Sequence, residues 1–322
     1  MLYLIIIFII LFCMVSIIFF IVIYKKKKNK KLDPNIVSEY VEPNIVSKYV
    51  ASNSLFNICI HKAELRKSEM TDLPKTYPNK DGDTIYITTT ALPNFVINYL
   101  PNIKNMFILV SGDSDYTIPD DYKNETNVIL NNKYLIKWYS QNCNLIDSKL
   151  VQLPIGLDYH TLLYRPLWGS LQSIIQQENN ISNILKIKTN KKNLCYGNFH
   201  FNIQTNDRVD ALKKISKDII YYEPTQIPRI ETWNNMIKYK YIISPHGNGL
   251  DCHRTWESII LGCIPIVKTS VLDSMYDGLP VLIVNDWSDI TAELLDTFKP
   301  NYKNIEKIYM TYWIDEFNKY KI

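Results

Sequence analysis

The chain has 322 residues, of which 47% are hydrophobic and 21% charged, so it can bury a core and is long enough for two ordinary domains. Its formal net charge is +4, but residues 1–31 carry six lysines and no acid, and taking those lysines away leaves −2 for the rest. The rest of the chain is therefore not basic, and we expect no nucleic-acid partner. Six scattered cysteines without CxxC spacing predict neither a disulfide framework nor a zinc site.

The first 24 residues are almost entirely apolar and have no charged side chain, which is enough for a single helix to cross a bilayer. They run directly into the lysine-rich segment 25–31, whereas a cleaved signal peptide would carry its positive charge first. We therefore expect an uncleaved transmembrane anchor at 1–24, with Lys25–Lys31 at the membrane surface. The positive-inside tendency then favours a single-pass protein with a cytosolic body. Residues 25–55, which contain the tandem repeat PNIVSEYVE and PNIVSKYV, are predicted to form a stalk.

Residues 56–185 are predicted to form an N-terminal α/β domain. Strands are expected at 84–88, 106–110 and 151–155. A short helix or strand is expected at 91–99, and residues 134–139 are predicted to be helical. Strands that alternate with helices favour a parallel sheet.

Residues 186–322 are predicted to form a second, more regular α/β domain, and an amphipathic helix within 171–191 marks the boundary. Strands are expected at 193–196, 219–222, 239–244, 264–267 and 280–284. Helices are expected at 208–217, at 232–238, from 251 onwards and at 289–298. In folds of this class, ligands bind beyond the carboxyl ends of the strands.

Residues 244–267, SPHGNGLDCHRTWESIILGCIPIV, contain more polar residues than a core segment needs. The predicted strand leads into a loop with Gly247 and Gly249, and then into a helix for which Asp251 is the expected N-cap. Glycines let the backbone approach a ligand closely, and free N–H groups at a helix start favour an anion. The dinucleotide fingerprint is incomplete, because position 252 is Cys.

Arg254 and Glu257 lie on one face of this predicted helix. The helix dipole disfavours a cation near the N-terminus, but an anionic ligand at the same end would remove that objection, and a guanidinium matches phosphate oxygens well. Glu257 is suited to accept hydrogen bonds from the paired hydroxyls of a ribose. The alternative is a structural ion pair between the two side chains. A metal site is disfavoured, because adjacent Cys252 and His253 would point in different directions.

The pattern SPHGNGLDxxRxxExxxxGCIP, which begins at Ser244, resembles the C-terminal motif of exostosin-like glycosyltransferases, and most closely the members from large DNA viruses and protists. Lys268, Leu272-Asp273 and the segment 279–287 extend the likeness, so it covers about 45 residues. A weaker likeness reaches upstream to residues 196–199, and the N-terminal half resembles the family less clearly.

The resemblance implies a GT-B enzyme, in which two Rossmann-like domains face a cleft. The C-terminal domain would bind a nucleotide sugar, expected to be UDP-linked, and the N-terminal domain a glycan or glycoprotein acceptor. Transfer in this family is inverting and generally requires no metal or other cofactor. By the resemblance, Arg254 contacts the diphosphate and Glu257 the ribose or base. The same site is expected to include Gly197, Asn198, Arg208, Ser244, His246, Gly247, Asn248, Gly249, Asp251 and Lys268.

An inverting transfer needs a base for the proton of the acceptor hydroxyl. Asp158 and His160 follow a predicted strand and a tight turn, and histidine titrates near neutrality, so they form our catalytic hypothesis. The alternative is that His160 only packs or forms hydrogen bonds within the loop. Asp113 and Asp115 also follow a strand, with a spacing by which some glycosyltransferases hold a divalent metal. Turns use aspartate for backbone reasons as well, so a turn role or a role on the acceptor side is the alternative.

Three functional hypotheses follow. The first is a membrane-anchored glycosyltransferase that needs no metal. The second is a metal-dependent glycosyltransferase that uses Asp113 and Asp115, and the third is a non-catalytic membrane adaptor that binds glycans or nucleotides. Because many cellular members of the resembled family work in the Golgi lumen, a Golgi or ER lumen location is the alternative to the cytosol.

Overall fold

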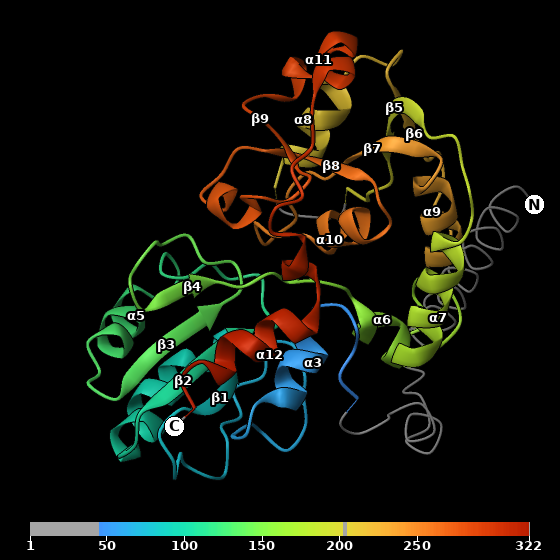
Figure 1. Cartoon of the computed structure of the whole chain (residues 1–322). Coiled ribbons are helices and arrows are strands. Elements are labelled where there is room, and N and C mark those ends of the chain that lie inside the picture. Colours follow the sequence, from blue (N-terminus) through green and yellow to red (C-terminus); the bar gives the residue numbers. More distant parts are fainter. Residues whose placement is uncertain (1–44, 202–204, 322) are drawn as a thin grey trace, which may run out of the picture. The chain divides into compact units, whose positions relative to one another are not determined.

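The computed structural model describes residues 45–201 and 205–321 and shows an α/β fold with two separate parallel sheets (Figure 1). The predicted anchor at 1–24 and the stalk up to residue 44 lie outside this part. Among the helices that are described, none combines the length and the apolar character needed to cross a membrane. The coarse fold class is thus confirmed, and the division into domains at residues 185 and 186 stays a prediction.

The first sheet has four parallel strands that lie side by side in their chain order. They are β1 (Asp83–Thr88), β2 (Phe107–Gly112), β3 (Leu135–Ser140) and β4 (Leu150–Gln152). Between them lie η1 (Thr89–Ala91), α4 (Leu92–Asn94), η2 (Phe95–Tyr99), η3 (Leu100–Asn102) and α5 (Lys123–Leu130). The expected strands at 84–88 and 106–110 are confirmed, the strand expected at 151–155 is present as the shorter β4, and 91–99 is helical.

Both faces of the first sheet are buried. Ile85, Ile87 and Leu109 pack on one face with the helical segments that follow β1 and β2. Tyr86 and Val110 pack on the other face. There they meet α3 (Ser52–Ile58) and the C-terminal helix α12 (Met310–Asn318) through Leu55, Phe56, Met310, Trp313 and Phe317 (Figure 1). The end of the chain therefore belongs to the packing of the first sheet.

The predicted helix at 134–139 is wrong, because residues 135–139 lie in strand β3. Trp138 packs into the core on one face of the sheet, and its neighbour Tyr139 packs into the core on the other. A strand buried on both faces has adjacent apolar residues instead of the alternation that reveals a half-buried strand. The run Leu135–Tyr139 therefore does not distinguish a strand from a buried helix.

The second sheet has five parallel strands in the order β6, β5, β7, β8, β9. Their bounds are β5 (Lys192–Gly197), β6 (Ile220–Tyr222), β7 (Tyr239–Ile243), β8 (Ile264–Lys268) and β9 (Leu282–Val284). One face packs against α7 (Ile174–Leu185), α9 (Arg229–Met236) and α10 (His253–Ile260), and the other against α8 (Asp207–Lys214), η5 (Trp287–Asp289) and α11 (Ala292–Thr297). The remaining helical elements are α6 (Tyr159–Tyr164), η4 (Asp273–Tyr276) and η6 (Ile305–Ile308). The expected strands and helices of this half are confirmed, with ends that shift by a few residues.

The strand order of the second sheet reverses at β5, whereas the first sheet has no reversal. From β5 the chain moves to β6 on one side, and then passes back across to β7 on the other side. The loops that follow β5 and β7 therefore leave the sheet in opposite directions and open a crevice at the carboxyl edge. In open α/β sheets this reversal is where ligands bind.

Asp251 joins the loop after β7 to the segments after β3 and β4. Its buried carboxylate accepts hydrogen bonds from the backbone N–H of Ile155 and of Cys252, each at 2.8 Å, and from the indole of Trp256 at 2.9 Å. Its own N–H donates to Asn142 at 2.9 Å. The prediction that Asp251 is the N-cap is wrong, since Cys252 takes that position and no side chain caps α10. Asp251 serves to connect segments instead.

Two glycines are required where these segments meet. A Cβ on Gly249 would lie 2.9 Å from the amide nitrogen of Asn142, which donates to Ser114 O at 3.0 Å. Gly156 has a φ of +66°, and a Cβ there would lie 1.9 Å from the carbonyl oxygen of Val50. One glycine of the SPHGNG loop thus permits packing against the first half of the chain.

We expect Asp251→Ala to lower the free energy of unfolding by about 3 kcal/mol, because three donors lose their acceptor at about 1 kcal/mol each. Urea denaturation of the purified protein measures this change. Asp72→Ala, at an exposed position, is the matched control and should shift stability by less than about 0.5 kcal/mol. Equal effects of the two substitutions would contradict a connecting role for Asp251.

Candidate functional site

A pocket of about 380 Å³ lies at the carboxyl ends of β5 and β6, at the strand reversal. This volume falls within the range of small-molecule sites. Aromatic rings line part of it: Trp168, Tyr196, Phe199, His200 and Phe201. Polar and charged side chains line much of the rest: Asp158, Asn198, Glu223, Thr225, Gln226, Arg229, Thr232, His253, Arg254 and Glu257. The combination suits a ligand with a flat apolar part and a charged part.

Arg254, in the first turn of α10, is a mostly buried cation in the pocket wall. Its guanidinium donates to two backbone carbonyls, those of Asn198 at 3.3 Å and Pro245 at 3.4 Å, and lies 5.3 Å from the ring centre of Phe199. In the part of the chain that the structure describes, no carboxylate lies within ion-pair distance of it. Burial lowers the pKa of Arg254 to about 10. A buried cation without an anionic partner is costly, so the pocket favours an anionic ligand.

Arg208, on α8, does not line the pocket but joins the two loops beside it. The guanidinium donates to the carbonyl oxygen of His200, after β5, at 2.7 Å, and to that of His246, after β7, at 3.3 Å. Burial lowers the pKa of Arg208 as well. The two loops on either side of the strand reversal are therefore held together by a second cation.

Arg229, the first residue of α9, connects two carboxylates at the pocket floor. Its Nη2 lies 2.6 Å from Oδ2 of Asp158, and its Nε lies 3.8 Å from Oε1 of Glu257. Asp158 also caps α6 by accepting a hydrogen bond from Thr161 N at 2.9 Å. Burial opposes ionisation, but the neighbouring His160 and Arg229 hold the pKa of Asp158 well below its usual range. Asp158 therefore stays ionised, binds Arg229, and is a weak base.

Glu257 pairs with Arg229 from another helix. The alternative of a structural ion pair with Arg254 along α10 does not occur among the described contacts. Glu257 lines the pocket, and its Oε1 lies 3.8 Å from Nε of Arg229.

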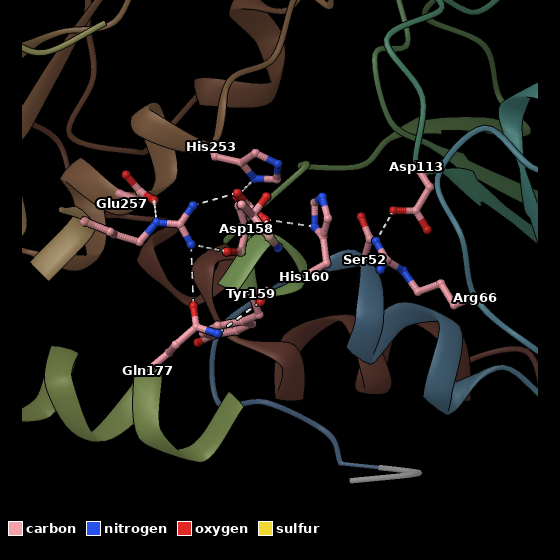
Figure 2. Close-up of polar contacts among 12 residues, drawn as sticks. Ser52, Arg66, Asp113, Asp158, Tyr159, His160, Gln177, His253 and Glu257 are labelled. Carbon is pink, nitrogen blue, oxygen red and sulfur yellow. Dashed lines mark hydrogen bonds and ion pairs between the residues drawn. The ribbon is translucent and has the colours of Figure 1, made fainter. Parts of the chain in front are cut away.

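His160 and His253 approach Asp158 from two different helices (Figure 2). Nδ1 of His160 lies 2.9 Å from Oδ1 of Asp158, and the His160 side chain is 29% exposed. Nδ1 of His253 lies 2.7 Å from the carbonyl oxygen of Gly156. Because a carbonyl only accepts, this nitrogen carries the proton and leaves Nε2 as an acceptor. Burial lowers the pKa of His253, which favours the neutral ring.

Asp158, His160 and His253 also form a group that could hold a metal ion, since one ligand atom from each lies within 4.8 Å of the others. Aspartate and histidine suit zinc and related metals. Both oxygens of Asp158, however, already accept from Thr161, His160 or Arg229, and the Arg229 charge lies directly beside the group. The residues therefore fit a hydrogen-bonded charge network better than a cation site.

The residues predicted for the nucleotide sugar fall into two groups. Asn198, Arg254 and Glu257 line the pocket. The others do not line it: Gly197, Arg208, Ser244, His246, Gly247, Asn248, Gly249, Asp251 and Lys268. Ser244 bonds to Thr255 at 2.9 Å, and His246 to the carbonyl of Leu250 at 2.7 Å, so they stabilise the loop and helix start. Lys268 faces Asp210 at 3.7 Å and Asp286 at 4.0 Å. Direct ligand contacts of this second group stay a prediction.

Asp113 and Asp115 are not equivalent in the structure. Asp113 is buried with a φ of +58°, pairs with Arg66 through Oδ1 and accepts from the hydroxyl of Tyr86 at 2.6 Å through Oδ2. Burial opposes ionisation, but Arg66 holds the pKa of Asp113 below its usual value. Asp115 is exposed. A carboxylate that is satisfied in this way fits the turn role and gives the metal hypothesis no support.

Sequence reasoning missed Arg229 and Glu223, and it considered His253 only for a metal site that it disfavoured. One signal could have indicated Arg229. It is the first residue of a helix, where the helix dipole disfavours a cation, as it does at Arg254. Glu223 gave no local signal, since its position in the pocket wall comes from the sheet topology. No protein-family model matches the chain, and a search of curated proteins finds no match.

We expect Arg229→Ala to destabilise the fold by about 3–5 kcal/mol at pH 7, because two buried carboxylates lose their cation. Asp158 contributes stability above its unfolded pKa and loses it as pH falls through its lower folded pKa. In the variant the pKa of Asp158 rises, so protonation of its carboxylate at acidic pH relieves the cost. Urea denaturation should therefore show a smaller difference at pH 4 than at pH 7.

The matched control is Arg165→Ala, an exposed arginine at the end of α6, which should change stability little at either pH. A pH-independent loss in Arg229→Ala would show that packing, rather than charge, explains its role.

Proposed function

We propose that the protein is a membrane-anchored inverting glycosyltransferase, which transfers a sugar from a nucleotide-sugar donor to a hydroxyl of a glycan or glycoprotein acceptor. The observation that carries this proposal is Arg254, a mostly buried cation in the wall of a pocket at a strand reversal, for which the described residues supply no carboxylate partner. The motif resemblance of residues 244–267 supports the same assignment. A GT-B arrangement, with Rossmann-like domains facing a cleft, is part of the proposal.

The donor would lie with its diphosphate at Arg254 and its nucleoside against the aromatic rings of the pocket. As the bond between the sugar and the diphosphate breaks, negative charge builds up on the diphosphate. A fixed guanidinium in a partly dry site stabilises that charge. Glu257, oriented by Arg229 at 3.8 Å, would accept hydrogen bonds from ribose hydroxyls. This division of roles requires no bound metal.

His160 would act as the general base, and Asp158 would position it. If Nδ1 of His160 donates to Asp158, at 2.9 Å, Nε2 is left to accept a proton. The acceptor oxygen attacks the anomeric carbon, the bond from that carbon to the diphosphate oxygen breaks, and the hydroxyl proton passes to His160. Attack from the face opposite the leaving group inverts the configuration.

Residues 1–24 would anchor the enzyme, with Lys25–Lys31 at the membrane surface. We propose a cytosolic catalytic body on the basis of these lysines, and a Golgi or ER lumen location is the alternative.

We expect Arg254→Ala to weaken the binding of a nucleoside diphosphate by about 10- to 100-fold, the range for a lost charged hydrogen bond. Affinity for the nucleoside without phosphates should change by less than about threefold. Folding stability should stay the same or rise, because a buried unpaired cation is removed. Calorimetry and thermal melting measure these three quantities.

Lys213→Ala, an exposed lysine of α8, is the matched control and should leave binding unchanged. If Arg254→Ala unfolds the protein, or weakens nucleoside and diphosphate equally, Arg254 is structural and the diphosphate assignment fails.

We expect His160→Gln to lower kcat by about 10²- to 10⁴-fold, the usual contribution of a general base, while donor affinity stays within about twofold. A transfer assay with purified protein measures the first quantity, and calorimetry the second. Wild-type turnover in this variant would exclude His160 as the base.

The same assay separates the other hypotheses. Turnover that is lost in EDTA and restored by a divalent metal would favour the metal-dependent glycosyltransferase, for which Asp113 and Asp115 are the predicted ligands. Tight donor binding without any turnover would favour the adaptor.

A further inference from the structure

Glu223 directly follows β6 and lies in the wall of the pocket described above. Its backbone N–H donates to the carbonyl of Gly197 at 2.9 Å, which fixes it beside the end of β5. Its Oε2 accepts from the hydroxyl of Tyr196 at 2.6 Å and from the amide of Asn235 at 3.2 Å. Lys238 donates to the other atom of that amide, its Oδ1, at 2.8 Å, so the Asn235 side chain has a defined orientation.

Glu223 is partly buried and has no cation within ion-pair distance among the residues that the structure describes. Two neutral donors hold one carboxylate oxygen, and for Oε1 the described residues supply no hydrogen bond. The pocket therefore combines an unpaired guanidinium, Arg254, with an unpaired carboxylate, Glu223. A ligand that complements both has an anionic part and a part rich in hydrogen-bond donors.

We propose that Glu223 selects guanine, so that the donor is a guanosine diphosphate sugar. This inference rests on the proposed function and differs from the UDP-linked donor that the motif resemblance implies. An ionised carboxylate only accepts hydrogen bonds. Guanine is the common base with two adjacent donors, N1–H and the 2-amino group, which can meet one carboxylate together.

The other bases fit a carboxylate less well. In uracil, the single N–H donor lies between two carbonyl oxygens, which an anionic group repels. Adenine and cytosine each have an amino donor next to a ring nitrogen that accepts. The ring centres of Trp168 and His200 lie 6.3 Å apart, and the planes of the two rings are inclined by 20°. These rings add flat surface on which a purine can stack.

Calorimetry on the full-length protein in detergent, with GDP and UDP as probes, tests this proposal. We expect GDP to bind at least about tenfold more tightly than UDP, because a site built for hydrogen bonding discriminates strongly. Glu223→Gln retains a carbonyl oxygen for Tyr196 but replaces the other acceptor by a donor. It should weaken GDP binding at least about tenfold and change UDP binding by less than about threefold.

Glu231→Gln, an exposed glutamate of α9, is the matched control and should alter neither affinity. Equal or tighter binding of UDP by the wild-type protein overturns the guanine assignment, and this comparison needs no variant. Equal weakening of both nucleotides in Glu223→Gln also overturns it, because Glu223 would then bind the ribose. In both cases the proposed function stands, whereas failure of both nucleotides to bind overturns the function as well.

Discussion

The reversal of strand order at β5 is the constraint on which the candidate site depends. This reversal separates the loop after β5 from the loop after β7. The first turns of α9 and α10 line the space between these two loops. Each of these helices has an arginine in its first turn, Arg229 and Arg254, where the helix dipole already adds positive potential. Topology thus collects positive charge at one point of the sheet edge, before any ligand contributes to it.

The protein neutralises only part of that charge. Arg229 pairs with the carboxylates of Asp158 and Glu257, whereas the partners that the described residues offer Arg254 are backbone carbonyls and an aromatic ring. Asp158 belongs to the chain segment that links the two sheets, and the carbonyl of Gly156 in the same segment fixes His253. The position of the histidines relative to Arg254 is therefore set by the contacts that join the two halves. Binding groups and candidate proton acceptors form one connected network.

Much of this arrangement follows from local sequence, and the rest depends on long-range contacts. Half-buried strands and amphipathic helices follow from periodicity, but β3 does not, because Trp138 and Tyr139 are buried on opposite faces. Arg254 is recognisable since it stands in a strand–loop–helix unit whose dipole it opposes. Glu223 follows an edge strand without any such local pattern, and only the sheet order places it in the pocket wall.

The SPHGNG loop supports the site mainly by positioning. Gly249 packs against Asn142, Ser244 bonds to Thr255, and the chain continues to Asp251, which is bound to the first half. These contacts fix where α10 begins, and hence where Arg254 and Glu257 face the pocket. A glycine-rich loop of this kind can resemble a phosphate-binding loop because both need close backbone approach. In this structure Gly249 of the loop approaches Asn142 of the same chain. The residue that faces the ligand space is Arg254, which follows the loop.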